Sequence, residues 1–360
     1  MIIKNPPVYN IKSLKKLFYG STNLIFENNI AIQSSYRGKD IIWTLQSAMR
    51  DDEYIETFVR NNKFSRVPSG DTIYRRLSES IDFEKIEPII DNSVKIGMSM
   101  GVFSEKVNVA IDEHDEPYYG KDNKYLINVG KKKFRGTDKA IRIASLDVVM
   151  EEKRFTVAFM PKHPIDGIDN SKEVEILLNK VINQGIKINL VLVDRGYLDV
   201  GVLRNIENLG LKYIVPAKEN PKTKNFMNYP LQYSSMDHCS YVIIKDELSD
   251  GKNRVASNFV RVIYWKEGKF HDFAFYTNVE VTENNVMELA ETYRKRWGIE
   301  NGYSKKKEIR LRSRSGNIRL RYFLYGLSII IYNFWVLLNI LAERMRQWIP
   351  LKDYLYFMTR

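Results

Sequence analysis

The spacing of apolar residues divides the chain into a helical first part and a strand-rich second part. Between positions 36 and 100, apolar residues recur at the spacing of helices that bury one face. A helix capped by Ser69 or Asp71 is expected to carry Arg75 and Arg76 on its polar side. Such a basic helix fits either a helix-turn-helix that binds DNA or a small bundle with no DNA role. The helices predicted here are Asp40–Met49, Asp52–Val59, Ser69–Leu77 and Phe83–Met100.

Beyond position 107, unbroken apolar runs replace the helical pattern. Val107–Ile111 and Ile188–Val193 are apolar at nearly every position, which suits central strands covered on both faces of a sheet. Residues from about 217 to 282 are rich in strand and turn signals, and a long helix is predicted from near Glu283. The other predicted strands are Ile141–Val149, Phe155–Met160, Tyr213–Pro216, Tyr241–Ile244, Phe259–Trp265 and Phe270–Tyr276, and the helices between them are Val174–Gln184 and Val200–Leu209.

One segment, Tyr322–Ala342, is long and apolar enough to cross a membrane. Ser328, Asn333 and Asn339 interrupt it, so we interpret it as the buried core helix of a protein that does not enter membranes. The N-terminal segment MIIKNPPVYN lacks the apolar stretch of a signal peptide. We therefore expect a cytoplasmic protein.

The charge balance adds a partner to this picture. The chain has 56 Lys and Arg against 44 Asp and Glu, a net charge of +12, which favours a polyanionic partner. From Glu291 to Arg321 there are 11 basic and 3 acidic residues, so the surplus is concentrated there. The single cysteine, Cys239, excludes an intramolecular disulfide and a zinc site built from several cysteines.

Within this basic region, four residues have a spacing that places them on one helical stripe. Arg296, Glu300 and Lys307 follow Tyr293 at angles of roughly −60°, −20° and −40° if each residue turns the helix by about 100°. A single acid among bases would weaken phosphate binding by itself. It fits a site in which Glu300 holds a metal ion while its neighbours hold a phosphate backbone, as phosphoryl transfer on nucleic acid requires.

Two aspartates supply the partners that Glu300 needs. Asp112 ends the predicted strand at VNVAI, and Asp194 ends the one at INLVLV, which is where a sheet presents side chains to a crevice. Three converging carboxylates repel each other unless cations lie between them, and two Mg²⁺ ions would satisfy them. Asp115 is an alternative to Asp112, because it lies three residues further along the same segment.

These residues resemble the signature of a known family. The segment from Tyr293 to Lys307 is similar to the Y-x2-R-x3-E-x6-K signature of DDE transposases from bacterial and archaeal insertion sequences, with all four positions filled. VAIDEHDEPYYG and VLVDRGY look like the blocks that hold the first and second aspartates of that family. The resemblance extends from about Val107 to Arg321 and adds a helical N-terminal region of the expected kind.

The resemblance implies an α/β fold: an RNase H-like mixed sheet flanked by helices, with a β-rich insertion at about 213–282 and an N-terminal helical domain. We predict a helical, DNA-binding region over 1–102, a catalytic domain over 103–345 and a C-terminal tail over 346–360. The implied metal ligands and catalytic residues are Asp112, Asp194 and Glu300. The residues expected to contact DNA are Tyr293, Arg296, Trp297, Lys305, Lys306, Lys307 and Arg310, with Arg75 and Arg76 in the N-terminal region; core packing is an alternative for Tyr293 and Trp297.

The implied activity is that of a transposase. With two Mg²⁺ ions, or Mn²⁺ in their place, it would cut double-stranded DNA at the terminal inverted repeats and join the ends to target DNA, as a homodimer in the synaptic complex. Two alternatives remain open: an RNase H-like nuclease that does not join ends, and a DNA-binding protein derived from a transposase that no longer catalyses.

Overall fold

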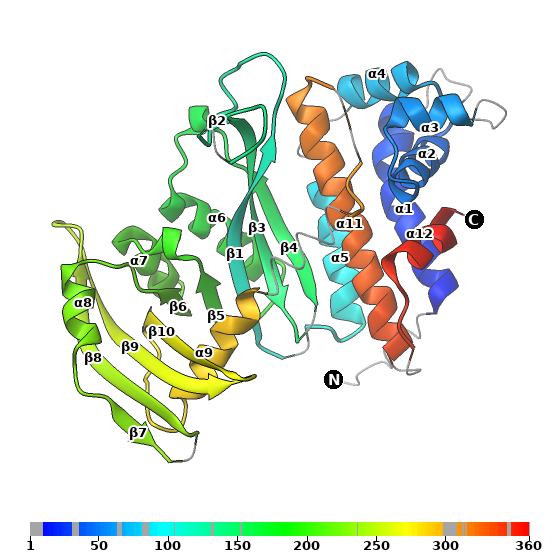
Figure 1. Cartoon of the computed structure of the whole chain (residues 1–360). Coiled ribbons are helices and arrows are strands. Elements are labelled where there is room, and N and C mark those ends of the chain that lie inside the picture. The colour runs from blue at the N-terminus through cyan, green and yellow to red at the C-terminus, as the bar shows by residue number, and fades with distance from the viewer. Residues whose placement is uncertain are drawn as a thin grey trace.

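The computed structural model describes residues 10–30, 36–62, 67–80, 86–103, 105–130, 133–151, 153–235, 237–297, 308–311, 313, 315–343 and 347–359. The first part of the chain is helical, as its apolar spacing predicts (Figure 1). Ser69, rather than Asp71, caps the fourth helix, because its hydroxyl accepts a hydrogen bond of 3.1 Å from the backbone N–H of Thr72. The helices are α1 (Ile11–Ile30), α2 (Gly38–Arg50), α3 (Ile55–Asn61), α4 (Gly70–Ser80) and α5 (Glu87–Ser99).

Ten strands in the described part of the chain form one mixed sheet in the order β2-β3-β1-β5-β6-β10-β9-β8-β7, with β4 paired to β3. The first half of this order consists of a β1–β3–β4 antiparallel meander and two parallel strands, β5 and β6. Two helices, α6 (Asn170–Asn183) and α7 (Val200–Asn208), connect these strands. The strands of this half are β1 (Val107–Pro117), β2 (Ile127–Asn128), β3 (Lys139–Val149), β4 (Arg154–Pro161), β5 (Ile188–Val193) and β6 (Lys212–Pro216).

The prediction that β1 ends at Asp112 is wrong, because the strand continues to Pro117. Its parallel pairing with β5 does stop there, and Ile111 opposite Val193 is the last pair in register. Antiparallel pairing with β3 continues from Asp112 to Pro117 and keeps the strand extended. Asp112 therefore lies in the middle of a strand, at the point where one of its two neighbours ends.

The residues predicted as a β-rich insertion extend the same sheet (Figure 1). β6 already pairs in parallel with β5, so the additional strands begin after Pro216. A helix that the apolar pattern did not predict, α8 (Pro221–Met227), starts this region, with the side chain of Asn220 accepting a hydrogen bond from the N–H of Thr223. The strands that follow are β7 (Gln232–Ser234), β8 (Cys239–Ser249), β9 (Arg254–Lys266) and β10 (Lys269–Thr277).

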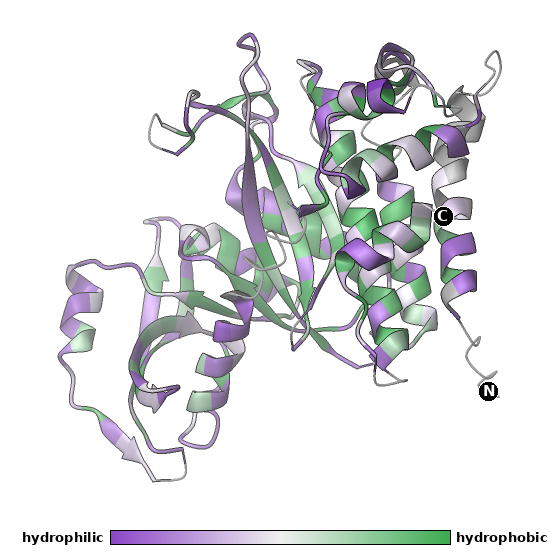
Figure 2. Cartoon of the chain, turned by 45° about the vertical axis from the view of Figure 1, so that its right-hand side comes forward, coloured by the Kyte–Doolittle hydropathy of each residue, from purple (hydrophilic) through white to green (hydrophobic). Residues whose placement is uncertain are grey.

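The apolar segment near the C-terminus forms α11 (Ile318–Glu343), which packs with α5 beside the sheet, with helices α1–α4 on its other side (Figure 1). Its most apolar window has a mean hydropathy of 1.8 and is 94% buried inside the protein, which agrees with a core helix. Figure 2 shows hydrophobic residues gathered on these central helices and on the strands beside them. In the segment predicted as a tail, α12 (Leu351–Thr359) packs against α2.

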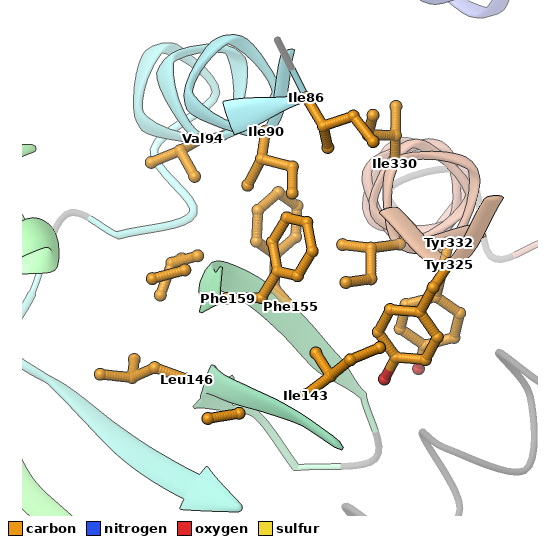
Figure 3. Packing of buried hydrophobic residues seen from close by; sticks show 14 of the residues in the cluster. Ile86, Ile90, Val94, Ile143, Leu146, Phe155, Phe159, Tyr325, Ile330 and Tyr332 are labelled. Carbon is orange, nitrogen blue, oxygen red and sulfur yellow. The ribbon is translucent and has the colours of Figure 1, made fainter. Parts of the chain in front are cut away.

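One continuous core joins the N-terminal helices to the sheet. Ile90 and Val94 of α5 face Phe155 and Phe159 of β4, and Ile330 of α11 closes the same cluster (Figure 3). All of these side chains are at most 1% exposed. The helical region predicted over 1–102 therefore shares its apolar core with the sheet.

A buried asparagine fixes α11 to this core. Asn333 accepts a hydrogen bond from the N–H of Thr156 at 3.1 Å and donates to its carbonyl at 2.8 Å. It also donates to the hydroxyl of Ser93 on α5 at 3.1 Å. A single amide thus links α11 to β4 and to α5, beside a register shift in the β3–β4 pairing.

We predict that Asn333→Leu destabilises the fold by about 2–4 kcal/mol, since it leaves two buried backbone groups of Thr156 without these bonds. Denaturant unfolding measures the change. Asn225→Leu, at an exposed position on α8, is the control and should change the unfolding free energy by less than about 0.5 kcal/mol. An equal loss in both variants would contradict the assigned role.

Candidate active site

The sheet places Asp112 and Asp194 next to each other. Each follows a member of the last parallel pair, Ile111 on β1 and Val193 on β5. Adjacent parallel strands that end at the same level present their next side chains to one crevice. Both carboxylates face the guanidinium of Arg296, at 3.8 Å from Asp112 Oδ2 and 3.1 Å from Asp194 Oδ1.

Arg296 reaches the aspartates from the helical segment after the extra strands. α9 (Val286–Arg294) ends before it, and Arg296 lies in the 3-10 turn η4 (Lys295–Trp297). The prediction of one continuous α-helix is therefore wrong at this point. Arg296 remains close to Tyr293, because a spacing of three residues places them one turn apart. Its side chain is only 9% exposed.

Tyr293 holds Arg296 in place. Its hydroxyl accepts a hydrogen bond of 2.9 Å from Nε of Arg296 and donates one of 3.3 Å to the carbonyl of Val193. Its ring is 3% exposed and stacks on Phe273 of β10 at 5.0 Å between centroids. Burial raises the pKa of the Tyr293 phenol well above its usual value. These contacts favour the packing alternative for Tyr293, and phosphate contact by Arg296 stays a prediction.

Asp112 is the electrostatically costly member of the pair. Burial raises its pKa from 3.8 to about 6, although Arg296 and a hydrogen bond from the N–H of Glu113 act in the opposite direction. The charges of Asp194 and Asp147 raise it further. Asp147 lies on β3 opposite Ala110, on the same face as Asp112, and is 1% exposed. Asp147 is the acidic residue within the otherwise mostly apolar strand Ile141–Val149, and this position was the sequence signal for it. The family signature does not include Asp147.

The alternative first ligand, Asp115, lies on the opposite face of β1, because side chains alternate along a strand. Arg142 binds it with two hydrogen bonds of 2.7 and 2.9 Å, and Lys133 adds one of 2.6 Å. Burial alone would raise the pKa of Asp115, but these cations outweigh it and hold the pKa below its usual value. Asp112, and not Asp115, shares a cation with Asp194.

The other predicted site residues are placed in part. Arg310 forms an ion pair with the buried carboxylate of Glu116, so its charge is engaged within the protein. Arg75 is exposed and Arg76 half-buried on α4. Outside the described residues lie Glu300, Lys305, Lys306 and Lys307, together with the side chain of Trp297.

A cavity of about 510 Å³ opens beside Asp194. Its lining includes Asp194, Arg195 and Arg296, together with His271 and Phe273 of β10. The strands added after β6 therefore contribute directly to the walls of this site.

The donor set fits a hard divalent cation. Asp112 and Asp194 offer carboxylate oxygens, the ligands that Mg²⁺ prefers, and burial raises the pKa of Asp112 by more than Arg296 lowers it. Within the described residues no three carboxylate, histidine or cysteine side chains are grouped closely enough to hold a metal ion by themselves.

Known proteins resemble this chain in part of its sequence and in its fold. Residues 164–334 match the family described as "Transposase DDE domain", a segment that holds Asp194, Tyr293 and Arg296. The cryo-EM structure of a piggyBac transposase synaptic complex with hairpin DNA is similar to the chain at a TM-score of 0.59 and 14% identity, over 98% of this chain and 80% of that chain. The NurA nuclease from Sulfolobus solfataricus reaches a TM-score of 0.29 at 9% identity, over 68% of this chain and 87% of that chain, too low to support an argument. No curated protein sequence matches.

The match of residues 164–334 to a transposase DDE domain supports an enzyme of the DDE transposase class. The likeness to the piggyBac structure supports the predicted RNase H-like fold, a large mixed sheet with helices.

The electrostatics of Asp112 predict a substitution that stabilises the protein. The pKa is higher in the folded state than the ordinary 3.8, so the folded protein binds an extra proton between about pH 4 and 6. Stability therefore falls as pH rises through this window and stays reduced above it. Without divalent ions, we expect Asp112→Asn to raise the unfolding free energy at pH 8 by about 1–3 kcal/mol and to change little at pH 4.

Denaturant unfolding in EDTA at the two pH values measures this effect. Asp115→Asn is the matched control with the opposite sign: the pKa of Asp115 is lowered in the fold, so removing its charge should destabilise the protein at pH 8. A loss of stability at pH 8 in Asp112→Asn would refute the conclusion that the buried charge of Asp112 destabilises the fold.

Proposed function

We propose that this protein is a transposase that cuts DNA at transposon ends and joins the ends to target DNA, in a reaction that requires Mg²⁺. The observation that carries the proposal is the convergence of Asp112 and Asp194 on Arg296 at the end of the β1–β5 pairing. The matched DDE domain supports it. The signature from Tyr293 to Lys307 further suggests an origin in bacterial or archaeal insertion sequences.

Asp112, Asp194 and Glu300 would hold two Mg²⁺ ions, with Mn²⁺ as a substitute; DDE transposases generally use divalent metal ions. When bound, such ions activate the attacking oxygen of water or a 3′-hydroxyl and stabilise the leaving oxygen. The protein's own contribution is positioning. β1 carries Asp112 and the end of β5 carries Asp194, while Arg296, held by Tyr293, keeps the two like charges facing one another.

The proposed substrate is double-stranded DNA: the terminal inverted repeats and the target. The piggyBac protein was solved with hairpin DNA, and the net charge of +12 here favours the same kind of partner. Arg75 and Arg76 on α4, together with Lys305, Lys306 and Lys307, would bind phosphates, and Trp297 would stack on a base. A homodimer that brings two ends together, in the cytoplasm at the nucleoid, completes the proposal.

We predict that Asp112→Ala, Asp194→Ala and Glu300→Ala each reduce cleavage of end DNA by at least about a thousandfold, since each removes a proposed metal ligand. DNA affinity, measured by fluorescence anisotropy, should change by less than about threefold, because phosphate contacts come from other residues. Asp115→Ala controls for general loss of charge on β1. Full cleavage by the three alanine variants would refute the proposed site.

Joining separates a transposase from a nuclease that only hydrolyses. With a pre-cut donor end bearing a free 3′-hydroxyl and a supercoiled plasmid, we expect covalently joined products in Mg²⁺, detected as labelled donor migrating with the plasmid. Cleavage without joined products would favour the nuclease alternative. Specific binding with neither reaction in Mg²⁺ or Mn²⁺ would favour a transposase-derived DNA-binding protein.

A further inference from the structure

A charged network lies behind the two aspartates, on the face of the sheet opposite the site. Its members are the side chains of Glu113 on β1, Lys162 after β4, Glu173 on α6 and Tyr197 in the 3-10 turn η3 (Arg195–Tyr197). Glu173 is fully buried and Tyr197 is 3% exposed. Buried charges of this kind are costly to maintain unless each is paired.

The contacts form one continuous chain. The hydroxyl of Tyr197 donates to Glu173 Oε1 at 2.5 Å, and Lys162 Nζ lies 2.7 Å from Glu173 Oε2. The same ammonium donates to Glu113 Oε1 at 2.5 Å and to Asn170 Oδ1 at 2.5 Å. Lys162 therefore joins the strand that carries Asp112 to the helix that holds Tyr197.

Both ends of this chain reach backbone next to an aspartate. Glu113 directly follows Asp112, and its own N–H donates to Asp112 Oδ1 at 2.9 Å. At the other end, the N–H of Tyr197 donates to the carbonyl of Asp194 at 2.9 Å and closes the turn that follows it. Glu113 is thus the residue next to Asp112, and Tyr197 lies three residues after Asp194 and is hydrogen-bonded to its backbone.

The position of the network matters because the β1–β5 pairing stops one residue before the aspartates. Up to Ile111 and Val193, ladder hydrogen bonds set the distance between the two strands. Beyond that pair β1 continues with β3, while the other chain turns into η3. Beyond the ladder, the relation between the two aspartates therefore depends on Arg296 in front of them and on what fixes the two segments from behind.

We propose that Glu113, Lys162, Glu173 and Tyr197 form a positioning network that sets the separation of the Asp112 and Asp194 carboxylates for metal binding and DNA cleavage. The proposal rests on the proposed function for its cleavage readout. None of the four side chains touches DNA or a metal ion in this role; they act through the backbone of the two aspartates.

The charges within the network support a fixed arrangement. Burial alone would lower the pKa of Lys162, but its hydrogen bonds to Glu113 and Glu173 outweigh burial and keep the ammonium charged. Burial raises the pKa of Tyr197 far above its usual value, so the phenol stays a hydrogen-bond donor to Glu173. Removing any single member leaves a buried partner without its bond.

The test uses Tyr197→Phe and Lys162→Met in the full-length protein, singly and together. We expect each single variant to lower the single-turnover rate of end cleavage by about tenfold to a hundredfold, as loss of outer contacts to metal ligands does. DNA affinity should stay within about twofold. Binding of Mn²⁺ to the protein without DNA, followed by electron paramagnetic resonance, should weaken by a similar factor. Because both residues act through Glu173, the double variant should lose less than the product of the single losses.

Tyr213→Phe is the matched control. It removes a buried hydroxyl that bonds to Ser257 at 3.1 Å, on β6 and away from the network. This variant should cleave DNA and bind Mn²⁺ like the wild type, while losing a similar amount of stability. Wild-type rates and Mn²⁺ affinity in Tyr197→Phe, or equal losses in Tyr213→Phe, would overturn the positioning role.

The Mn²⁺ arm separates failure of this inference from failure of the proposed function. If the wild-type protein binds Mn²⁺ but cuts no DNA, the proposed function fails. Weaker Mn²⁺ binding by Tyr197→Phe then still supports the network, and unchanged binding refutes it. If Asp112→Ala and Asp194→Ala bind Mn²⁺ like the wild type, the ion is held elsewhere and the network has no metal ligands to position, which also refutes it.

Discussion

The end of the β1–β5 pairing is the constraint on which the site depends. One residue past Ile111 and Val193, two carboxylates face each other in a partly desolvated crevice, where like charges repel strongly. Arg296 compensates for both, Tyr293 orients Arg296, and Phe273 of β10 packs against Tyr293. β10, which lies two strands beyond β5, therefore contacts the site through Phe273, Tyr293 and Arg296.

β1 shows how one strand serves two purposes by alternation. Asp112 and Glu116 lie on the face of the site, and Glu113 and Asp115 lie on the face that α6 covers. The neighbours decide what each carboxylate does. Arg142 and Lys133 surround Asp115 at hydrogen-bond distance and lower its pKa, whereas the guanidinium of Arg296 lies 3.8 Å from Asp112, whose pKa burial raises.

The sequence predicted features that depend on local pattern and missed those that depend on neighbours. The apolar run of β5 was predicted with its correct bounds, because a central strand needs apolar residues on both faces. The extension of β1 was missed, since Asp112–Glu116 is polar at every position and only pairing with β3 reveals a strand there. α8 has Asn220 as its N-cap and Pro221 as its first residue, both of which favour a helix start. The helix is only seven residues long and lies in a region rich in strand and turn signals, so it was not predicted. The position of Arg296 between the aspartates follows from the early end of α9, which no spacing rule indicates.

The raised pKa of Asp112, in contrast to the lowered pKa of Asp115, suits the proposed metal site. A carboxylate held by two short bonds, as Asp115 is, has most of its lone pairs engaged and would give up much energy to bind a metal ion. Asp112 accepts a hydrogen bond of 2.9 Å from the N–H of Glu113 and faces Arg296 at 3.8 Å, and the guanidinium limits repulsion from Asp194. The buried charge of Asp112 lowers the unfolding free energy, and a bound divalent ion would raise it again. In the proposed metal site, the network would hold the two aspartates from behind, and a bound cation would offset the cost of the buried Asp112 charge.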